Sequence, residues 1–388
     1  MAWAWSTLLF RIDVIFTSGF PIFFWNRPRW STNEIPDQTG RVVLVTGGNS
    51  GTGYATCKAL YEKGATVYLA CRSPERAEEA IQDIKRGVTY KLTGKVYPEN
   101  AERTEEKRKG TGSLVFMELD LADLSSIKRF VEEFKQKEQR LDVLFANAGV
   151  MASPEGMRTQ QGYTLQFGTN CLGHQYLISL LLPLLQYTSS SNPQALSRVI
   201  LVSSAGHGMA PRGGFKPESV MPDYPQGGPS WRDSTYGSLD NGSENDGEPR
   251  RGKHELQRWL EYGQSKWGGV ALARWLHWTY GPVEGREKPE VLMLYQSGMV
   301  ATNLAQHISL TPYIVRFAPW AVGLITRPPS DGALNQIWAG TCPEQTARNL
   351  SGQYLVPFLK VGRARPDLDD LERVKCVWDW CSEQTEGF

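Results

Sequence analysis

Short apolar runs alternate with segments of helical spacing along most of the chain, and this alternation limits the fold more than any other feature. The apolar runs occupy residues 41–46, 65–71, 113–121, 141–149, 198–204, 290–298 and 352–358. Segments with helical spacing occupy residues 52–64, 74–85, 124–137, 164–185 and 262–280. Strands that alternate with helices form a parallel sheet that is covered on both faces. We therefore predict an α/β fold with a doubly wound parallel sheet of about seven strands.

The alternating pattern predicts a single domain over residues 40–360, flanked by an apolar N-terminal arm (1–39) and a C-terminal helix (within 361–388). The uncharged stretches of the arm, 1–10 and 14–25, are shorter than the roughly 18–20 apolar residues that span a bilayer. The basic start of a signal peptide is also missing. Four tryptophans within residues 1–30 would suit peripheral contact with a membrane surface, and the alternative is an arm packed on the protein itself.

Residues 211–252 form the clearest low-complexity stretch, with six prolines and eight glycines. Such a composition is poorly suited to burying a core. We predict an inserted loop beside the functional site, which either caps the substrate or extends into solvent, and the composition favours solvent.

The overall charge and the cysteine pattern exclude several classes of protein. A formal net charge of +1 over 388 residues argues against nucleic-acid binding, which needs a basic face. Six scattered cysteines and five histidines form neither a disulfide framework nor a metal-spaced cluster. We expect no metal site and a reduced, intracellular setting, either cytoplasmic or peripherally attached to an internal membrane.

A glycine-rich turn, TGGNSGTG at residues 46–53, joins the first predicted strand to the first predicted helix. Glycines let the backbone approach a pyrophosphate, and the helix N-terminus offers free N–H groups and the positive end of its dipole. The spacing is not that of a P-loop, because no Gly-Lys-Ser/Thr follows. The turn predicts a dinucleotide site, and the alternative is a plain tight turn.

Two further patterns predict the chemistry. Tyr262 and Lys266 are four residues apart and share a helix face, and an ammonium group near a phenol favours the ionised phenol. Ser203 and Ser204 end the fifth strand, where a hydroxyl can hold a substrate carbonyl. A hydrolase nucleophile would need a GxSxG elbow, which the chain lacks, and we interpret His207 nearby as structural.

Taken in order, these motifs resemble those of the short-chain dehydrogenase/reductase family, over residues 40–358. Residues 145–149 (FANAG) are similar to the family's NNAG signature, and the stretches YLACR, ANAGVM and NCLGHQYL look most like the retinol dehydrogenase-like branch and its fungal relatives. The resemblance implies a Rossmann-type fold. It also matches Asp120-Leu121 to the pair beside the adenine ring and Asn170 to the asparagine of the catalytic tetrad.

The resemblance implies a role for each catalytic residue. Tyr262 would be the general acid/base, Lys266 would lower its pKa, and Ser204 would polarise the carbonyl. Asn170 would hold a water that links Lys266 to solvent. The implied cofactor-binding residues are Thr46, Gly47, Asn49, Ser50, Gly51, Gly53, Arg72, Asp120, Leu121, Asn147, Ala148, Gly149, Tyr262, Lys266, Val300 and Thr302.

The end of the second strand indicates which cofactor is used. A site that prefers NAD has an acidic residue there, whereas this chain has Arg72, whose guanidinium matches a phosphate. We therefore predict NADP(H), with Ser50 as a further contact. After the sixth strand the chain has Ser297-Gly298 where the family usually has Pro-Gly, so this turn lacks its stiffening proline.

The predicted substrate is a small-molecule alcohol, ketone or aldehyde that is lipophilic or a secondary metabolite. The apolar run 313–325 is interpreted either as a hydrophobic lid or as a helix packed in the core. Two alternatives stay open: a nucleotide-binding scaffold or sensor without turnover, and a nucleotide-sugar epimerase or dehydratase. The spacing of Gly47, Gly51 and Gly53 counts against the epimerase, and the sequence does not indicate an oligomeric state.

Overall fold

A computed structural model describes residues 28–88, 112–192, 195–221, 257–282 and 328–388, together with the backbone of residues 89–90, 96–98, 251–256 and 292–296. Several predictions fall outside these residues. They concern the arm at 1–27, the part of the insert at 222–250, the predicted cofactor contacts Val300 and Thr302, and the apolar run 313–325. Among the described residues, no helix combines the length and the apolar character that crossing a membrane requires.

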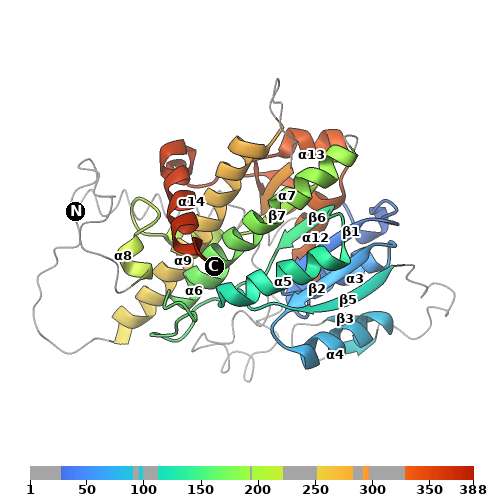
Figure 1. Cartoon of the computed structure of the whole chain (residues 1–388), viewed down its shortest axis with the longest axis horizontal. Coiled ribbons are helices and arrows are strands. Elements are labelled where there is room, and N and C mark those ends of the chain that lie inside the picture. Colours follow the sequence, from blue (N-terminus) through green and yellow to red (C-terminus); the bar gives the residue numbers. More distant parts are fainter. Residues whose placement is uncertain are drawn as a thin grey trace, which may run out of the picture.

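One sheet runs through the described part of the chain, in the strand order β10-β9-β8-β7-β6-β1-β2-β5 (Figure 1). Its strands are β1 (Val42–Thr46), β2 (Thr66–Cys71), β5 (Ser113–Glu118), β6 (Val143–Ala146), β7 (Arg198–Val202), β8 (Leu292–Gln296), β9 (Tyr354–Val356) and β10 (Lys360–Val361). All neighbouring strands pair in parallel except β10, which is antiparallel to β9. The predicted Rossmann-type sheet of about seven strands is confirmed, and the two-residue β10 adds an edge that the sequence pattern does not reveal.

Strand β1 shows why the central strands read as continuous apolar runs. Val42 and Leu44 face one hydrophobic core, and Val43 and Val45 face the other. Because both faces of the sheet are buried, no polar alternation is needed. The order of the strands reverses between β1 and β6, and this is the point at which ligands bind in such sheets.

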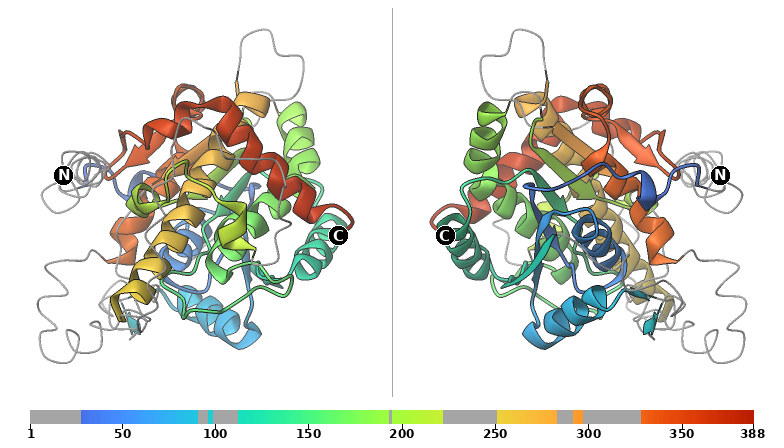
Figure 2. Two further views of the ribbon diagram at one scale, coloured as in Figure 1. Left: turned by 90° about the vertical axis from the view of Figure 1, so that its left-hand side faces the viewer. Right: turned by 90° about the vertical axis from the view of Figure 1, so that its right-hand side faces the viewer.

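Helices cover both faces of the sheet (Figures 1 and 2). One layer contributes α5 (Leu124–Lys137), α6 (Leu165–Phe167), the π-helical turn η3 (Gly168–Leu172), α7 (Gly173–Ser191), α9 (Arg251–Tyr280) and α14 (Leu371–Thr385). The other contributes α3 (Gly51–Tyr61), α4 (Pro74–Lys85), α12 (Pro329–Thr341) and α13 (Glu344–Leu350). Shorter elements are η1 (Thr32–Glu34), the hairpin strands β3 (Val88–Tyr90) and β4 (Val96–Pro98), η4 (Ala205–Met209), α8 (Pro217–Val220) and η6 (Pro366–Asp369).

Local capping explains where the predicted helices begin. The Ser73 side chain accepts a hydrogen bond from the Arg76 N–H, and Asp123 does the same for the Ser125 N–H. Accordingly, α4 and α5 have the predicted bounds. Helices α12 and α13 were not predicted, because glycines and prolines interrupt the apolar spacing of residues 328–350.

The first part of the predicted insert departs from the sequence interpretation. Residues 211–221 are packed rather than solvated, since Phe215 and Val220 are buried in the core. The Phe215 ring lies 5.0 Å from that of Phe167 and 5.1 Å from that of Trp380. Residues 251–252 already belong to α9. The expectation that 211–252 buries no core is therefore wrong for residues 211–221, because composition does not show which single aromatic residue will be buried.

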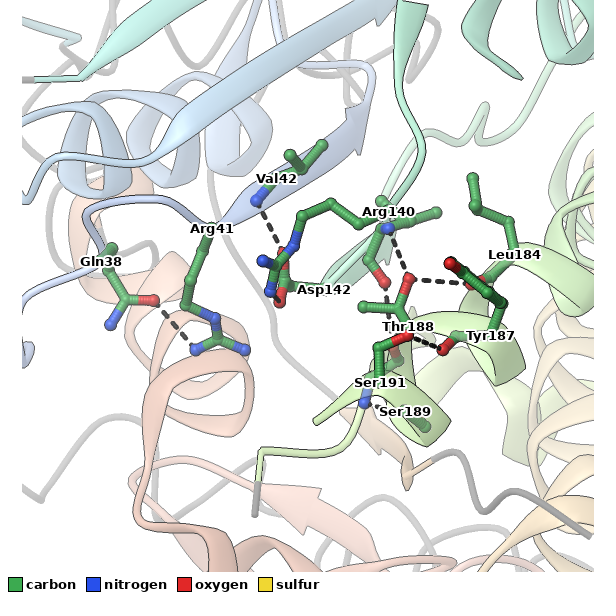
Figure 3. A network of polar contacts seen from close by, with 12 residues as sticks. Gln38, Arg41, Val42, Arg140, Asp142, Leu184, Tyr187, Thr188, Ser189 and Ser191 are labelled. Atoms are coloured by element: carbon green, nitrogen blue, oxygen red, sulfur yellow. Dashed lines mark hydrogen bonds and ion pairs between the residues drawn. The ribbon is translucent and has the colours of Figure 1, made fainter. Parts of the chain in front are cut away.

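The amino ends of the strands carry a polar network (Figure 3). Asp142 accepts hydrogen bonds from the Val42 N–H at 2.8 Å and from Arg140 at 2.6 and 2.9 Å. Arg41 donates to Gln38 at 3.0 Å, and burial together with the nearby Arg198 charge lowers the pKa of Arg41 to about 10. This edge lies opposite the strand ends at which the predicted site residues gather.

Candidate active site

The glycine-rich turn lies between β1 and α3, as predicted. Ser50 precedes the helix, and α3 begins at Gly51. A Cβ atom on Gly53 would lie 2.2 Å from the Gly47 carbonyl oxygen, so no larger residue fits where the helix meets the turn. The backbone of the first helical turn is therefore directly beside the loop, which is the arrangement that binds a phosphate.

Thr46 joins this turn to the end of β6. Its hydroxyl oxygen accepts hydrogen bonds from the N–H groups of Asn147 and Ala148, both at 2.9 Å. The Asn147 amide donates to the Thr46 carbonyl at 2.8 Å and accepts from the Thr52 hydroxyl at 2.8 Å. These bonds fix the two strand ends on either side of the point at which the strand order reverses.

Gln336 is a part of this arrangement that sequence reasoning missed. Its amide donates to Asn147 Oδ1 at 3.1 Å and to the Thr56 hydroxyl at 2.6 Å. Gln336 comes from α12, far along the chain, and no local pattern singles it out.

Arg72 and Asp120 follow neighbouring strands, β2 and β5, at the same edge of the sheet. Arg72 is exposed, and the next residue, Ser73, caps α4. Asp120 accepts from the Ala122 N–H at 2.9 Å, and Leu121 is buried beside it. An exposed guanidinium therefore lies at the edge of the sheet at which the cofactor site is predicted.

The two serines that end β7 have different partners. Ser203 donates to the Lys266 carbonyl at 3.0 Å. Ser204 accepts from the Gly206 N–H at 3.1 Å, and its side chain also forms a hydrogen bond with Tyr262. Of the two hydroxyls, the one on Ser204 faces the phenol, which is the placement predicted for the carbonyl-polarising residue.

Tyr262 and Lys266 are both buried on α9, with 4% and 5% of their surface exposed. The Lys266 Nζ atom lies 5.8 Å from the centroid of the Tyr262 ring and donates to the Val202 carbonyl at 3.1 Å. Burial lowers the pKa of Lys266 to about 8. Burial also raises the pKa of Tyr262 to about 12, against the opposing effect of the Ser204 hydrogen bond.

The direction of the Tyr262 shift differs from the sequence expectation. A lysine one helical turn away was expected to lower the pKa of the phenol. In the structure, the loss of water outweighs any such effect, because the ammonium is directed at a backbone carbonyl. Both groups therefore carry their protons at neutral pH.

Asn170 belongs to the π-helical turn η3, and its side-chain amide forms hydrogen bonds with the Val150 backbone and with the Ser265 hydroxyl. It accepts from the Val150 N–H at 2.8 Å and donates to the Val150 carbonyl at 2.9 Å. It also donates to the Ser265 hydroxyl at 2.9 Å, which in turn donates to the Tyr262 carbonyl at 2.8 Å. Turns of this kind are frequent at functional sites.

Gly149 shows how closely these groups converge. A Cβ atom there would lie 3.1 Å from Asn170 Oδ1 and 3.2 Å from Lys266 Nζ. The structure therefore brings together Asn170, Lys266 and the turn after β6, with Tyr262 and Ser204 adjoining. Val300 and Thr302 lie outside the described residues.

His207 is buried and supports the serine loop, in line with its interpretation as structural. Its Nδ1 atom contacts the Ser204 carbonyl at 2.8 Å, and the Arg365 N–H donates to Nε2 at 3.3 Å. Burial lowers the pKa of His207 to about 4.

Comparison with known proteins gives consistent matches. The family model described as short chain dehydrogenase matches residues 41–97 and 95–215. A short-chain dehydrogenase/reductase of Armillaria gallica is 38% identical over 363 residues, covering 93% of this chain and 96% of the relative. Retinol dehydrogenase 14 of Homo sapiens is 32% identical over 344 residues, covering 88% of this chain and 84% of the relative.

A solved structure shares the fold. The crystal structure of a protein from Mycobacterium paratuberculosis is 25% identical and superposes with a TM-score of 0.56, covering 92% of this chain and 97% of that one.

Proposed function

This chain belongs to the short-chain dehydrogenase/reductase family of oxidoreductases, and on that premise we propose that it uses NADP(H) to interconvert an alcohol and a ketone or aldehyde. The observation that carries the proposal is the convergence of Ser204, Tyr262 and Lys266 at the carboxyl edge of the sheet. A scaffold that only binds a nucleotide gains nothing from three buried polar groups in this arrangement.

The residues of the site fit a dinucleotide on structural grounds. At Gly48 and Gly53 the turn has no room for a Cβ atom, which would lie 2.8 and 2.2 Å from its neighbours, and the turn leads into the first turn of α3. An ammonium has three N–H donors, and the Val202 carbonyl uses one of those on Lys266, so a ribose hydroxyl can take another. When bound, the cofactor supplies or accepts the hydride.

Tyr262 acts in the proposed reaction as the proton donor to a carbonyl oxygen. With a pKa of about 12 its hydroxyl is protonated at neutral pH, which is the form that reduction requires. Ser204 hydrogen-bonds the phenol and would hold the same substrate oxygen, so that both groups stabilise the charge that develops there. Lys266 keeps a positive charge near the phenol and would stabilise the phenolate that forms when Tyr262 gives up its proton. The phenolate then has to regain a proton before the next reduction.

The preference for NADP(H) is proposed from Arg72. The residue is exposed just after β2, where an NAD site would present a carboxylate to the ribose 2′-hydroxyl. Its guanidinium offers a planar fork of donors to a 2′-phosphate. Ser50 precedes α3 and forms no side-chain cap hydrogen bond, which leaves its hydroxyl for a second contact.

We propose a lipophilic substrate. One relative is named for retinol, a lipophilic alcohol, and is 32% identical to this chain. The apolar run 313–325, for which the sequence predicts either a lid or a helix packed in the core, lies outside the described residues.

A redox screen of the full chain tests this proposal. NADPH and NADH are each combined with a panel of lipophilic ketones and aldehydes, and the oxidised cofactors with the matching alcohols. We expect turnover of at least one lipophilic compound and a preference for NADPH. Cofactor binding without any turnover across the panel would favour the scaffold interpretation instead.

A further inference from the structure

His174 contacts two residues of the site, although no role was predicted for it. It lies one helical turn after Asn170, on α7, and only 2% of its surface is exposed. Its Nδ1 atom lies 3.1 Å from the Asn170 carbonyl oxygen, and its Nε2 atom lies 3.0 Å from the Thr46 hydroxyl oxygen. The ring therefore joins the end of β1 to the π-helical turn.

The hydrogen-bond chemistry determines which ring nitrogen carries the proton. Burial and the nearby Lys266 charge lower the pKa of His174 to about 4, so the ring is neutral at pH 7 and has one N–H. A carbonyl oxygen only accepts, so the proton must be on Nδ1. Nε2 then accepts the proton of the Thr46 hydroxyl. The other acceptor within reach of that hydroxyl, the Phe145 carbonyl, is more distant at 3.3 Å.

These bonds form one directed chain. The N–H groups of Asn147 and Ala148 donate to Thr46, Thr46 donates to His174, and His174 donates to the Asn170 carbonyl. The Asn170 side chain continues the chain to Ser265, whose hydroxyl donates to the Tyr262 carbonyl.

We propose that His174 is a positioning residue, which holds the cofactor-binding strand end at Thr46 in fixed register with the proton-transfer group on Tyr262. The inference rests on the proposed function, because register matters only if hydride and proton reach the same carbonyl. An apolar ring of similar size would fill the space, but it would release both the Thr46 hydroxyl and the Asn170 carbonyl. A glutamine provides one donor and one acceptor on a flexible stem, so it can restore part of the connection.

Kinetics of three variants test this proposal. His174→Phe is expected to lower kcat by about 10- to 100-fold, the cost of misplacing reacting groups, while the cofactor Kd changes by less than about threefold. His174→Gln is expected to recover at least about a third of the wild-type kcat. The control is His277→Phe, which removes a half-buried histidine bonded to Ser351 and should leave kcat unchanged.

A kcat for His174→Phe within about twofold of wild type would overturn the proposal, since a ring that only packs is replaceable. An equal loss in His174→Gln and His174→Phe would also overturn it, as would a loss that appears entirely in the cofactor Kd.

A second measurement needs neither turnover nor a folded His174 variant. Nitrogen-15 NMR of the histidine rings in the wild-type chain, with signals assigned by replacing the other histidines one at a time, reports the tautomer directly. We expect His174 to carry its proton on Nδ1 at pH 7, and a proton on Nε2 or a charged ring would refute the directed chain. If the redox screen finds no turnover, the proposed function fails, while the tautomer still decides whether this connection exists.

Discussion

The buried charged groups at the two ends of the central strands differ in whether a partner of opposite charge is bonded to them. At the amino ends, two buried charges have partners of opposite charge: Asp142 is bonded by Arg140 and by the Val42 N–H, and Arg198 pairs with Glu344 at 3.3 Å. Arg41 differs, because its bonded partner is the neutral Gln38. At the carboxyl ends, the buried Lys266 ammonium has only a backbone carbonyl as its bonded partner among the described residues. The pKa values of Lys266 and Tyr262 are accordingly shifted by burial.

This difference implies that polar groups at the amino edge of the sheet contribute to stability, whereas those at the carboxyl edge are available for reaction. A paired and hydrogen-bonded charge supports the fold but has little capacity to react. A buried group without an opposite charge reduces stability, but it is ready to bind a charged ligand or to move a proton. We therefore expect substitutions at the two edges to have separable effects.

The largest effect is expected at the carboxyl edge. Tyr262→Phe removes only the hydroxyl that carries the proton, so kcat should fall by about 10²- to 10⁴-fold with cofactor binding retained. Steady-state kinetics and a cofactor titration measure the two quantities. The matched control is Tyr163→Phe, which removes a buried hydroxyl bonded to Gln384 at 3.0 Å and should keep its activity. Turnover above about 1% of wild type in Tyr262→Phe would refute the assignment.

The next effect is expected at the amino edge, on stability alone. Asp142→Ala leaves the Val42 N–H and Arg140 without their acceptor. Because Arg140 is partly exposed and can be solvated, the free energy of unfolding should fall by about 1–3 kcal/mol, mainly for the unsatisfied backbone N–H. Denaturant unfolding measures this loss. Asp379→Ala, at a surface pair with Lys375, should cost less than about 1 kcal/mol. A changed cofactor Kd in folded Asp142→Ala would show that the two edges are not separable.

A third prediction concerns the cofactor. Arg72→Asp removes the donors proposed for the 2′-phosphate and places a negative charge there, so the ratio of kcat/KM for NADPH over NADH should fall by about 10- to 100-fold. The melting temperature should not change, because the side chain is exposed. Arg76→Asp, at another exposed arginine one turn into α4, tests whether any nearby charge reversal has the same effect. A wild-type preference for NADH, or an unchanged ratio in Arg72→Asp, would contradict the proposed role.

The smallest expected effect is a loss of stability in mild acid, which arises from two buried histidines at the carboxyl edge. Burial lowers the pKa of His174 and of His207 to about 4 from 6.5, so the unfolded chain takes up these protons first. The stability that each neutral ring contributes is therefore present above pH 6.5 and is lost as the pH falls toward 4. At pH 5.5 each of these two histidines should lower the free energy of unfolding by about 1 kcal/mol relative to pH 8. Denaturant unfolding of His207→Gln should show a weaker pH dependence than wild type, and an unchanged dependence would exclude His207 as a source.

Much of the fold is predictable from the sequence because its signals are local. Ser73 and Asp123 cap their own helices, and β1 is apolar on both faces, so α4, α5 and the central strands follow from short windows of residues. The candidate site is predictable for a related reason, since parallel strands bring their carboxyl ends to one edge.

The contacts that hold the site together could not be predicted in this way. Gln336 reaches Asn147 from α12, and His174 bridges two elements through its ring nitrogens. Phe215 is buried although its neighbours in sequence suggest a solvated loop. The pKa of Tyr262 shifts upward because burial depends on the packed fold, which residue spacing does not express.

Deuterium transfer tests the central claim most directly. The wild-type chain is incubated with NADPH carrying deuterium at both C4 positions and a ketone that responds in the redox screen, and the product is examined by mass spectrometry. We predict one deuterium on the carbinol carbon, none on that carbon when unlabelled NADPH is used in deuterated water, and at most about 1% as much labelled product from Tyr262→Phe in the same time. A wild-type product without deuterium on that carbon would contradict the account, as would equal labelling by Tyr262→Phe.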